Sequence, residues 1–176
     1  MGVTDMTSQP QLLQIALDKK DVVYTPDWVA RDMVEFFKPS GRILEPSAGD
    51  GAFLKYLPGA DWCEIEKGRD FYSVNEHYDW IVGNPPYSEK LPWLRKSMTT
   101  ADNIVYLLPL NSPFNSSAIM LDLREWGGIV HMRYHGTGGE MGFPFGYPCG
   151  AIYFKKGYRG AMEISYSRSR ERLGIG

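Results

Sequence analysis

The spacing of apolar positions along the chain predicts alternating helices and strands. From residue 27 onward, apolar side chains recur every three or four residues and predict a helix over Asp27–Phe37, which Pro39-Ser40-Gly41 should end. Short continuous apolar runs elsewhere are typical of strands buried on both faces of a sheet. The strands expected in this way cover Arg42–Leu44, Asp61–Ile65, Tyr78–Val82 and Asn103–Leu108, and further helices are expected over Gly51–Leu57, over Glu89–Met98 and within Pro113–Trp126.

Helices that alternate with strands indicate a mainly parallel sheet with right-handed crossovers. Two more strands, expected over Gly128–Tyr134 and Cys149–Lys155, are joined by a long glycine-rich loop without a helical crossover. One of the two should therefore run antiparallel to its neighbours. We expect an α/β fold with a mostly parallel sheet and helices on both of its faces.

The chain of 176 residues, 43% of them hydrophobic, is long enough for one domain with one sizeable core. We expect a polar N-terminal arm over residues 1–20, one globular domain over 21–160 and a basic tail over 161–176. A net charge of -2 argues against a general nucleic-acid-coating protein, although a local basic rim is compatible with it. Only two cysteines are present, no apolar run reaches membrane-spanning length, and the first residues lack a signal-peptide pattern. These features favour a cytoplasmic protein without membrane contact.

A stiff tetrapeptide, Asn84-Pro85-Pro86-Tyr87, follows the strand expected over Tyr78–Val82. The prolines fix φ and bias the residues before them toward extended backbone, so the Asn84 amide oxygen and the Pro85 carbonyl can point together at a bound amine. Tyr87 adds a flat face for a planar ring. The pattern predicts a site for an amino group conjugated to an aromatic ring or a carbonyl. Double prolines also simply end strands, which is the alternative interpretation.

A second motif, Glu45-Pro46-Ser47-Ala48-Gly49-Asp50-Gly51, joins an expected strand to an expected helix. Gly49 and Gly51 let the backbone pass close to a ligand. The run matches neither the dinucleotide fingerprint nor a phosphate-binding P-loop. Glu45 stands at the carboxyl end of its strand, where open α/β sheets bind ligands, and its carboxylate suits a cationic amino-acid ligand better than a phosphate.

Together, these motifs resemble the S-adenosylmethionine-dependent amino-methyltransferases. The order of the motifs, with the cofactor motifs first, is similar to that of the adenine-N6 DNA methyltransferases, and the resemblance covers residues 22–156. It implies a Rossmann-like methyltransferase fold of about seven strands. It also implies S-adenosyl-L-methionine as the cofactor, nucleic acid, first of all DNA, as the partner, and no metal.

The resemblance implies roles for single residues as well. Tyr24 and Thr25 match the N-terminal cofactor motif, Glu64-Ile65 the strand end that holds the ribose, and Asp70-Phe71 the pair on the cofactor adenine. The implied cofactor set is Tyr24, Thr25, Glu45, Ala48, Gly49, Gly51, Glu64, Ile65, Asp70, Phe71 and Asn84. Thr25 could instead only cap a helix, and Glu64 could be a solvated strand end. Only five residues separate Glu64 from Asp70, too few for the helix that the family places there. Either the third strand is vestigial or Asp70 reaches the adenine from a short loop.

In this interpretation the catalytic residues are Asn84, Pro85, Pro86 and Tyr87. Asn84 and Pro85 would accept hydrogen bonds from the amine of a base flipped out of its duplex, and Tyr87 would stack on that base. Phe143 or Phe145 would flank that base beside Tyr87, or both phenylalanines would only pack in the core. Arg168, Arg170 and Arg172 could follow a nucleic-acid backbone or belong to a solvated tail.

Several alternatives stay open at this point. Methylation of adenine in RNA or of a protein glutamine amide would use the same acceptors, and a non-catalytic cofactor-binding subunit would keep the fold. No separate target-recognition domain is expected, so base recognition would come from short loops, from a homodimer or from a specificity subunit. His131 and His135 share a spacing of four, but no third ligand stands nearby, and we expect no metal site.

Overall fold

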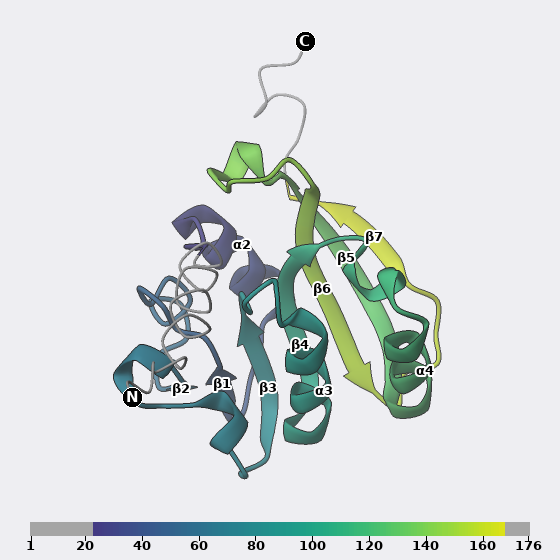
Figure 1. The fold of residues 1–176 in the computed structure, drawn as a ribbon, viewed down its shortest axis with the longest axis horizontal. Helices are drawn as coiled ribbons and strands as arrows, with labels where there is room; N and C mark the ends of the chain where they lie inside the picture. Colours follow the sequence, from purple (N-terminus) through teal and green to yellow (C-terminus); the bar gives the residue numbers. More distant parts are fainter. Residues whose placement is uncertain (1–22, 168–176) are drawn as a thin grey trace, which may run out of the picture.

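The computed structural model describes residues 23–167, which form a single seven-stranded sheet with helices packed against it (Figure 1). The predicted N-terminal arm and the residues beyond 167 lie outside the described part. The strands are β1 (Ile43–Glu45), β2 (Asp61–Trp62), β3 (Tyr78–Gly83), β4 (Ala101–Pro109), β5 (Gly127–Thr137), β6 (Pro148–Lys156) and β7 (Glu163–Tyr166). The α-helices are α2 (Asp27–Phe37), α3 (Lys90–Thr100) and α4 (Ser117–Trp126), and short 3-10 helices cover Ile65–Lys67, Phe71–Ser73, Ser112–Asn115 and Gly139–Met141.

The strands lie in the order β2-β1-β3-β4-β6-β5-β7. The first four of these run parallel, whereas β6 is antiparallel to both β4 and β5. The antiparallel member expected in the closing pair is thus β6. Because β1, β3, β4 and β5 all run the same way, their carboxyl ends meet at one edge of the sheet, the edge at which open α/β sheets bind ligands.

Two hydrophobic clusters cover the two faces of the sheet. On one face α3 and α4 contribute Leu94, Met98, Ile119 and Leu123 to a cluster that also takes in Ile104. On the other face, Val29, Ala30 and Met33 of α2 pack with Phe53 and Leu57. The expected α/β architecture with helices on both faces is therefore confirmed.

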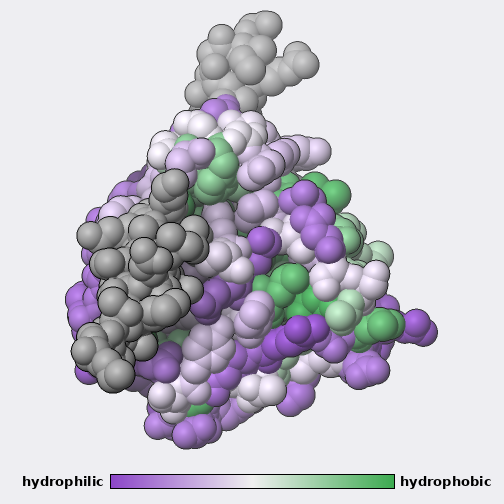
Figure 2. Space-filling model, viewed as in Figure 1, coloured by the Kyte–Doolittle hydropathy of each residue, from purple (hydrophilic) through white to green (hydrophobic). Residues whose placement is uncertain are grey.

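An apolar surface gathers over α4 on the face seen in Figure 2. Phe114 and Leu121 are both more than half exposed there, and they line an open depression of about 580 Å³ together with Met120. Among residues 23–167, no helix is long and apolar enough to cross a lipid bilayer.

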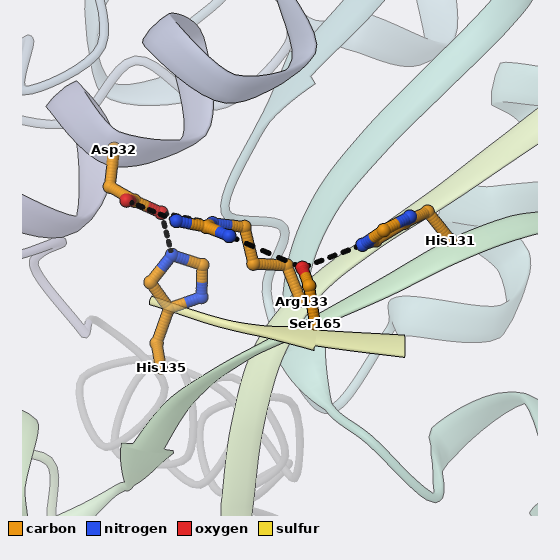
Figure 3. Close-up of polar contacts among 5 residues, drawn as sticks. All are labelled: Asp32, His131, Arg133, His135 and Ser165. Atoms are coloured by element: carbon orange, nitrogen blue, oxygen red, sulfur yellow. Dashed lines mark hydrogen bonds and ion pairs between the residues drawn. The ribbon is translucent and has the colours of Figure 1, made fainter. Parts of the chain in front are cut away.

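Helix α2 has the predicted bounds, and a charged cluster fastens it to the sheet (Figure 3). Asp32 of α2 accepts two hydrogen bonds from the Arg133 guanidinium, at 2.6 and 2.8 Å, and lies 2.8 Å from Nε2 of the buried His135. Burial alone would raise the pKa of the Asp32 carboxyl, but the hydrogen bonds from Arg133 and His135 outweigh it and hold that pKa well below its ordinary value. The cluster joins α2 to β5 across about a hundred residues of sequence.

The predicted helix over Gly51–Leu57 is wrong. The segment forms successive turns, with Gly51 at φ +85°, and Pro58-Gly59 follows it directly. A helix would need αR backbone from its first residues, and proline and glycine leave no room for it to continue.

The strand expected over Asp61–Ile65 is shorter than predicted, since β2 ends at Trp62 and a 3-10 turn starts at Ile65. Glu64 pairs with Arg69 in an isolated bridge. The described residues form no further strand between β2 and β3, so the third strand that the resemblance implies is absent from this edge.

The seventh strand stands instead at the opposite edge, where β7 pairs in parallel with β5. It occupies part of the segment expected as a basic tail, and the sequence pattern did not predict it. Ser165 of β7 lies 2.7 Å from Nε2 of His131 and accepts a hydrogen bond from Arg133 at 3.2 Å (Figure 3). Both histidines that share a spacing of four therefore contact protein groups, and in the described residues no group of three or more His, Cys, Asp or Glu could hold a metal ion.

Candidate active site at the carboxyl ends of the strands

Glu45 is the last residue of β1, and its side chain is almost completely buried. The Ser47 backbone N–H donates to its Oε1 at 3.1 Å, while its Oε2 is buried with no hydrogen-bond partner among residues 23–167. The carboxyl lies under Gly83, where a Cβ would overlap it. Burial raises the pKa of Glu45 to about 8, although the Ser47 hydrogen bonds oppose the shift.

Ser47 links the glycine turn to the diproline corner. Its hydroxyl donates to the backbone carbonyl of Asn84 at 2.9 Å and lies 3.4 Å from Oε1 of Glu45. The two motifs, nearly forty residues apart in sequence, thus meet through one side chain. Parallel pairing of β1 with β3 brings them to the same place.

In the Asn84 side-chain amide, the nitrogen is hydrogen-bonded and the oxygen has no partner among the described residues. Its Nδ2 donates to the carbonyl of Val23 at 3.0 Å, which fixes the orientation of the side chain. Its Oδ1 is buried and has no hydrogen-bond partner among the described residues. A buried acceptor without a partner is costly, so its presence points to a donor supplied from outside the described residues.

The N-terminal motif lies beside the same turn. The Tyr24 ring is about 3.9 Å from the position that a Cβ on Gly49 would take, and Tyr24 itself is 60% exposed. Gly49 (φ +51°) donates its N–H to Oε2 of Glu64 at 2.7 Å. Tyr24 and Glu64 therefore both lie against the backbone turn at Gly49. Thr25 follows Tyr24 in sequence, and the buried Ala48 precedes Gly49.

The three further residues expected at the cofactor, Ile65, Asp70 and Phe71, differ in their exposure and in their contacts. Ile65 is exposed, and the Asp70 carboxylate accepts from the Tyr72 N–H at 3.0 Å, capping the 3-10 turn that follows. Phe71 is buried, with its ring 4.9 Å from that of Trp93 in the core on the α3 face. Asp70 thus stands on a short loop, and Phe71 contributes to packing.

Tyr87 meets the glycine-rich loop that follows β5. Its ring centroid lies 5.4 Å from that of Phe145 and 6.5 Å from that of Phe143. Phe143 is buried, whereas Phe145 is only partly buried. The structure thus brings both candidate aromatics to the diproline corner, with Phe145 nearer the surface.

The basic residues after the corner make contacts within the protein. Lys90 donates to the Tyr87 carbonyl at 2.9 Å, Lys96 donates to the Val74 carbonyl at 2.6 Å, and Arg95 pairs with Asp122 at 2.6 Å. Lys90 braces the corner itself.

Sequence reasoning missed two partners of the site. Ser47 stands inside the glycine motif, but nothing in its spacing reveals that its hydroxyl reaches Asn84. Val23 acts through its backbone carbonyl, which carries no side-chain signal. Both contacts depend on how three separate segments meet in the fold.

No protein-family model matches the chain, and no curated protein matches it in sequence. Solved structures do resemble it. The methyltransferase subunit of a type I restriction-modification system from Streptococcus thermophilus aligns over 81% of this chain and 46% of its own, with a TM-score of 0.60 and 16% identity. A candidate class I S-adenosylmethionine-dependent methyltransferase of Listeria monocytogenes aligns over 93% and 75%, with a TM-score of 0.60 and 14% identity.

A third structure, a candidate RNA methyltransferase of Pyrococcus horikoshii, aligns over 86% of this chain and 99% of its own, with a TM-score of 0.53 and 14% identity. The fold is a methyltransferase fold. At these identities the likeness concerns the fold, and this methyltransferase-fold chain spans about half the length of the type I modification subunits that it resembles.

Proposed function

We propose that this chain is an S-adenosylmethionine-dependent methyltransferase that modifies the N6 amine of adenine in DNA. The observation that carries the proposal is the Asn84 amide, whose nitrogen is fixed by Val23 and whose buried oxygen has no partner among the described residues. The glycine turn of a cofactor-type motif lies directly against it through Ser47.

The residues at this edge fit the proposed cofactor. Gly49 and Gly51 both have positive φ and offer a turn without side chains. Glu64 places a carboxylate at that turn, which suits ribose hydroxyls, and Tyr24 places a partly exposed ring over it. Thr25, Glu45 and Asp70 would complete the surroundings, with Ile65 exposed beside them. The ring of Phe71 packs in the core and would form the floor of the cofactor site from that side.

S-adenosylmethionine would supply a methyl group that its sulfonium already activates, so the task of the protein is alignment. Oδ1 of Asn84 and the carbonyl of Pro85 would accept the two hydrogens of the adenine amine and return electron density to its nitrogen. Pro86 holds the corner stiff. Tyr87 would stack on the base with Phe145, while the buried Phe143 supports both rings. The proton released from the amine would pass to solvent.

A stacked base cannot reach such a corner, so the target nucleotide would be flipped out at a cost of a few kcal/mol. Stacking on Tyr87 and Phe145 would offset on the order of 1–3 kcal/mol of this. The likeness to modification subunits of type I restriction systems supports DNA as the substrate. Sequence recognition would then come from a specificity subunit or from a second copy of this chain.

The test is transfer of label from methyl-labelled S-adenosylmethionine to separate pools of duplex DNA, structured RNA and protein. We expect label in DNA, and we expect Asn84→Ala to lose at least a hundredfold in rate while Asn75→Ala, an exposed asparagine away from the corner, keeps the parent rate. Label in DNA that persists in Asn84→Ala would contradict the proposed site.

Adenine in RNA is the second candidate substrate, because RNA methyltransferases are also among the similar folds. Label confined to the RNA pool would favour it, and label confined to protein would favour a glutamine amide. Binding of S-adenosylhomocysteine measured by calorimetry, with no transfer to any pool, would instead indicate a non-catalytic subunit.

A further inference from the structure

An exposed tyrosine continues the aromatic surface beyond the diproline corner. The ring of Tyr147 stacks on Phe145, with centroids 5.7 Å apart and planes inclined by 28°. Phe145 in turn lies 5.4 Å from Tyr87. Tyr147 is 60% exposed, so the three rings lead from the corner to the surface in one path.

The loop that carries these rings is braced by its own backbone. The Gly138 N–H donates to the Tyr147 carbonyl at 2.8 Å, and the Phe143 N–H donates to the Gly138 carbonyl at 2.8 Å. The Phe145 ring lies directly on Gly138, where a Cβ would come within 2.6 Å of it. Tyr147 is therefore presented by a fixed loop, and a rigid exposed ring loses little conformational entropy on binding a flat ligand.

We propose that Tyr147, backed by the ring of Phe145, forms a second stacking subsite, which holds an unpaired nucleobase next to the target adenine in the same strand. The inference rests on the proposed function and adds a ligand position to it. A nucleobase fits because Tyr147 presents an exposed aromatic ring that stacks on Phe145, and Phe145 lies against Tyr87 at the target-base position. Base stacking of this kind tolerates any sequence, since every base has a π face.

Binding of short fluorescein-labelled single-stranded oligonucleotides, measured by anisotropy with S-adenosylhomocysteine present, tests the subsite. Each oligonucleotide carries one adenine among thymines, either intact or with an abasic position on one side of the adenine. We expect Tyr147→Ala to bind the intact strand about tenfold more weakly, and Tyr147→Phe to keep the parent affinity because it keeps the ring. The loss should shrink strongly for one of the two abasic strands, since that strand lacks the base which Tyr147 holds.

The matched control is Tyr166→Ala, which removes another mostly exposed tyrosine, from β7, and should leave the affinity unchanged. Equal affinity of Tyr147→Ala and the parent would overturn the subsite, as would a loss that is the same on intact and abasic strands. The subsite would also be overturned if Tyr147→Ala weakened the binding of a glutamine-containing peptide and left the binding of the oligonucleotides unchanged.

Asn84→Ala separates this inference from the proposed function. If the parent methylates DNA and Asn84→Ala does not, while Tyr147→Ala binds as the parent does, only the subsite fails. If the parent neither binds nor methylates any nucleic acid, the proposed function and the subsite fail together.

Discussion

At the scale of single residues, Ser47 connects the two motifs that the sequence carries separately. Its hydroxyl holds the Asn84 carbonyl, and its N–H holds the Glu45 carboxyl. Removing the hydroxyl would free the backbone carbonyl of Asn84 and would leave the Ser47 N–H on the Glu45 carboxyl in place. Ser47 is therefore a positioning residue.

We predict that Ser47→Ala lowers kcat by on the order of tenfold, since loss of one hydrogen bond loosens Asn84 by about 1 kcal/mol. The dissociation constant for S-adenosylhomocysteine should change little. Ser47→Thr, which keeps a hydroxyl, should recover most of the rate. Steady-state kinetics together with calorimetry would measure both quantities, and a Thr variant as slow as the Ala variant would contradict the role.

Glu45 should make the stability of the protein depend on pH. Its ordinary pKa is 4.5, and burial raises it to about 8 in the folded chain. The folded state therefore holds the proton more tightly than the unfolded chain does, so the stabilisation from Glu45 is complete below about pH 4.5 and is lost as the pH rises through about 8.

We predict that Glu45→Gln, which stays neutral, loses less stability than the parent between about pH 5 and pH 8. Urea unfolding at a series of pH values gives the free energy of unfolding for both proteins. Parallel curves for the parent and the variant would show that Glu45 does not titrate in this way.

At the scale of elements, the segments with strong periodicity were the predictable ones. Helix α2 has the bounds that its apolar spacing and its following Pro39 indicated, and β3 and β4 are buried strands as expected. The turns over Gly51–Leu57 were not predictable, because apolar side chains there reach the core without a helix. Strand β7 was missed since Ile164 and Tyr166 are exposed on an edge strand and carry no burial pattern.

A further prediction at this scale concerns the charged cluster of Asp32, Arg133 and His135, which joins α2 to β5. Asp32→Asn leaves the Arg133 guanidinium and His135 facing a neutral partner, and breaking such a buried pair costs about 3–5 kcal/mol when both groups are fully buried. Asp32 is partly exposed, so we expect a loss of about 3 kcal/mol in the free energy of unfolding.

The matched control is Asp27→Asn on the same helix, which removes an exposed ion pair with Lys55 and should cost much less stability than Asp32→Asn. Urea unfolding of both variants compares them directly. Equal losses of stability in the two variants would mean that the charged cluster does not fasten α2 to the sheet.

At the scale of the whole molecule, the sheet gathers the site from segments that the sequence separates. Glu45 and Asn84 could be placed at the same edge because parallel strands end there, whereas the Ser47 hydroxyl that joins the two motifs could not be predicted. The contact of Tyr87 with Phe145 could be proposed only as one of two choices, since the loop path after β5 leaves no periodic signal. The sequence could not show that Phe71 also packs in the core, where the short 3-10 turn after Asp70 carries its ring toward Trp93.

The measurement that tests the central claim most directly is the position of a transferred methyl group. Duplex DNA incubated with the protein and trideuteromethyl-labelled S-adenosylmethionine is digested to nucleosides and analysed by mass spectrometry. If the Asn84 amide and the Pro85 carbonyl receive an adenine amine, the label will appear as N6-methyldeoxyadenosine with the parent protein and vanish with Asn84→Ala. Label on another nucleoside, or on adenine at the same level in both proteins, would contradict the account.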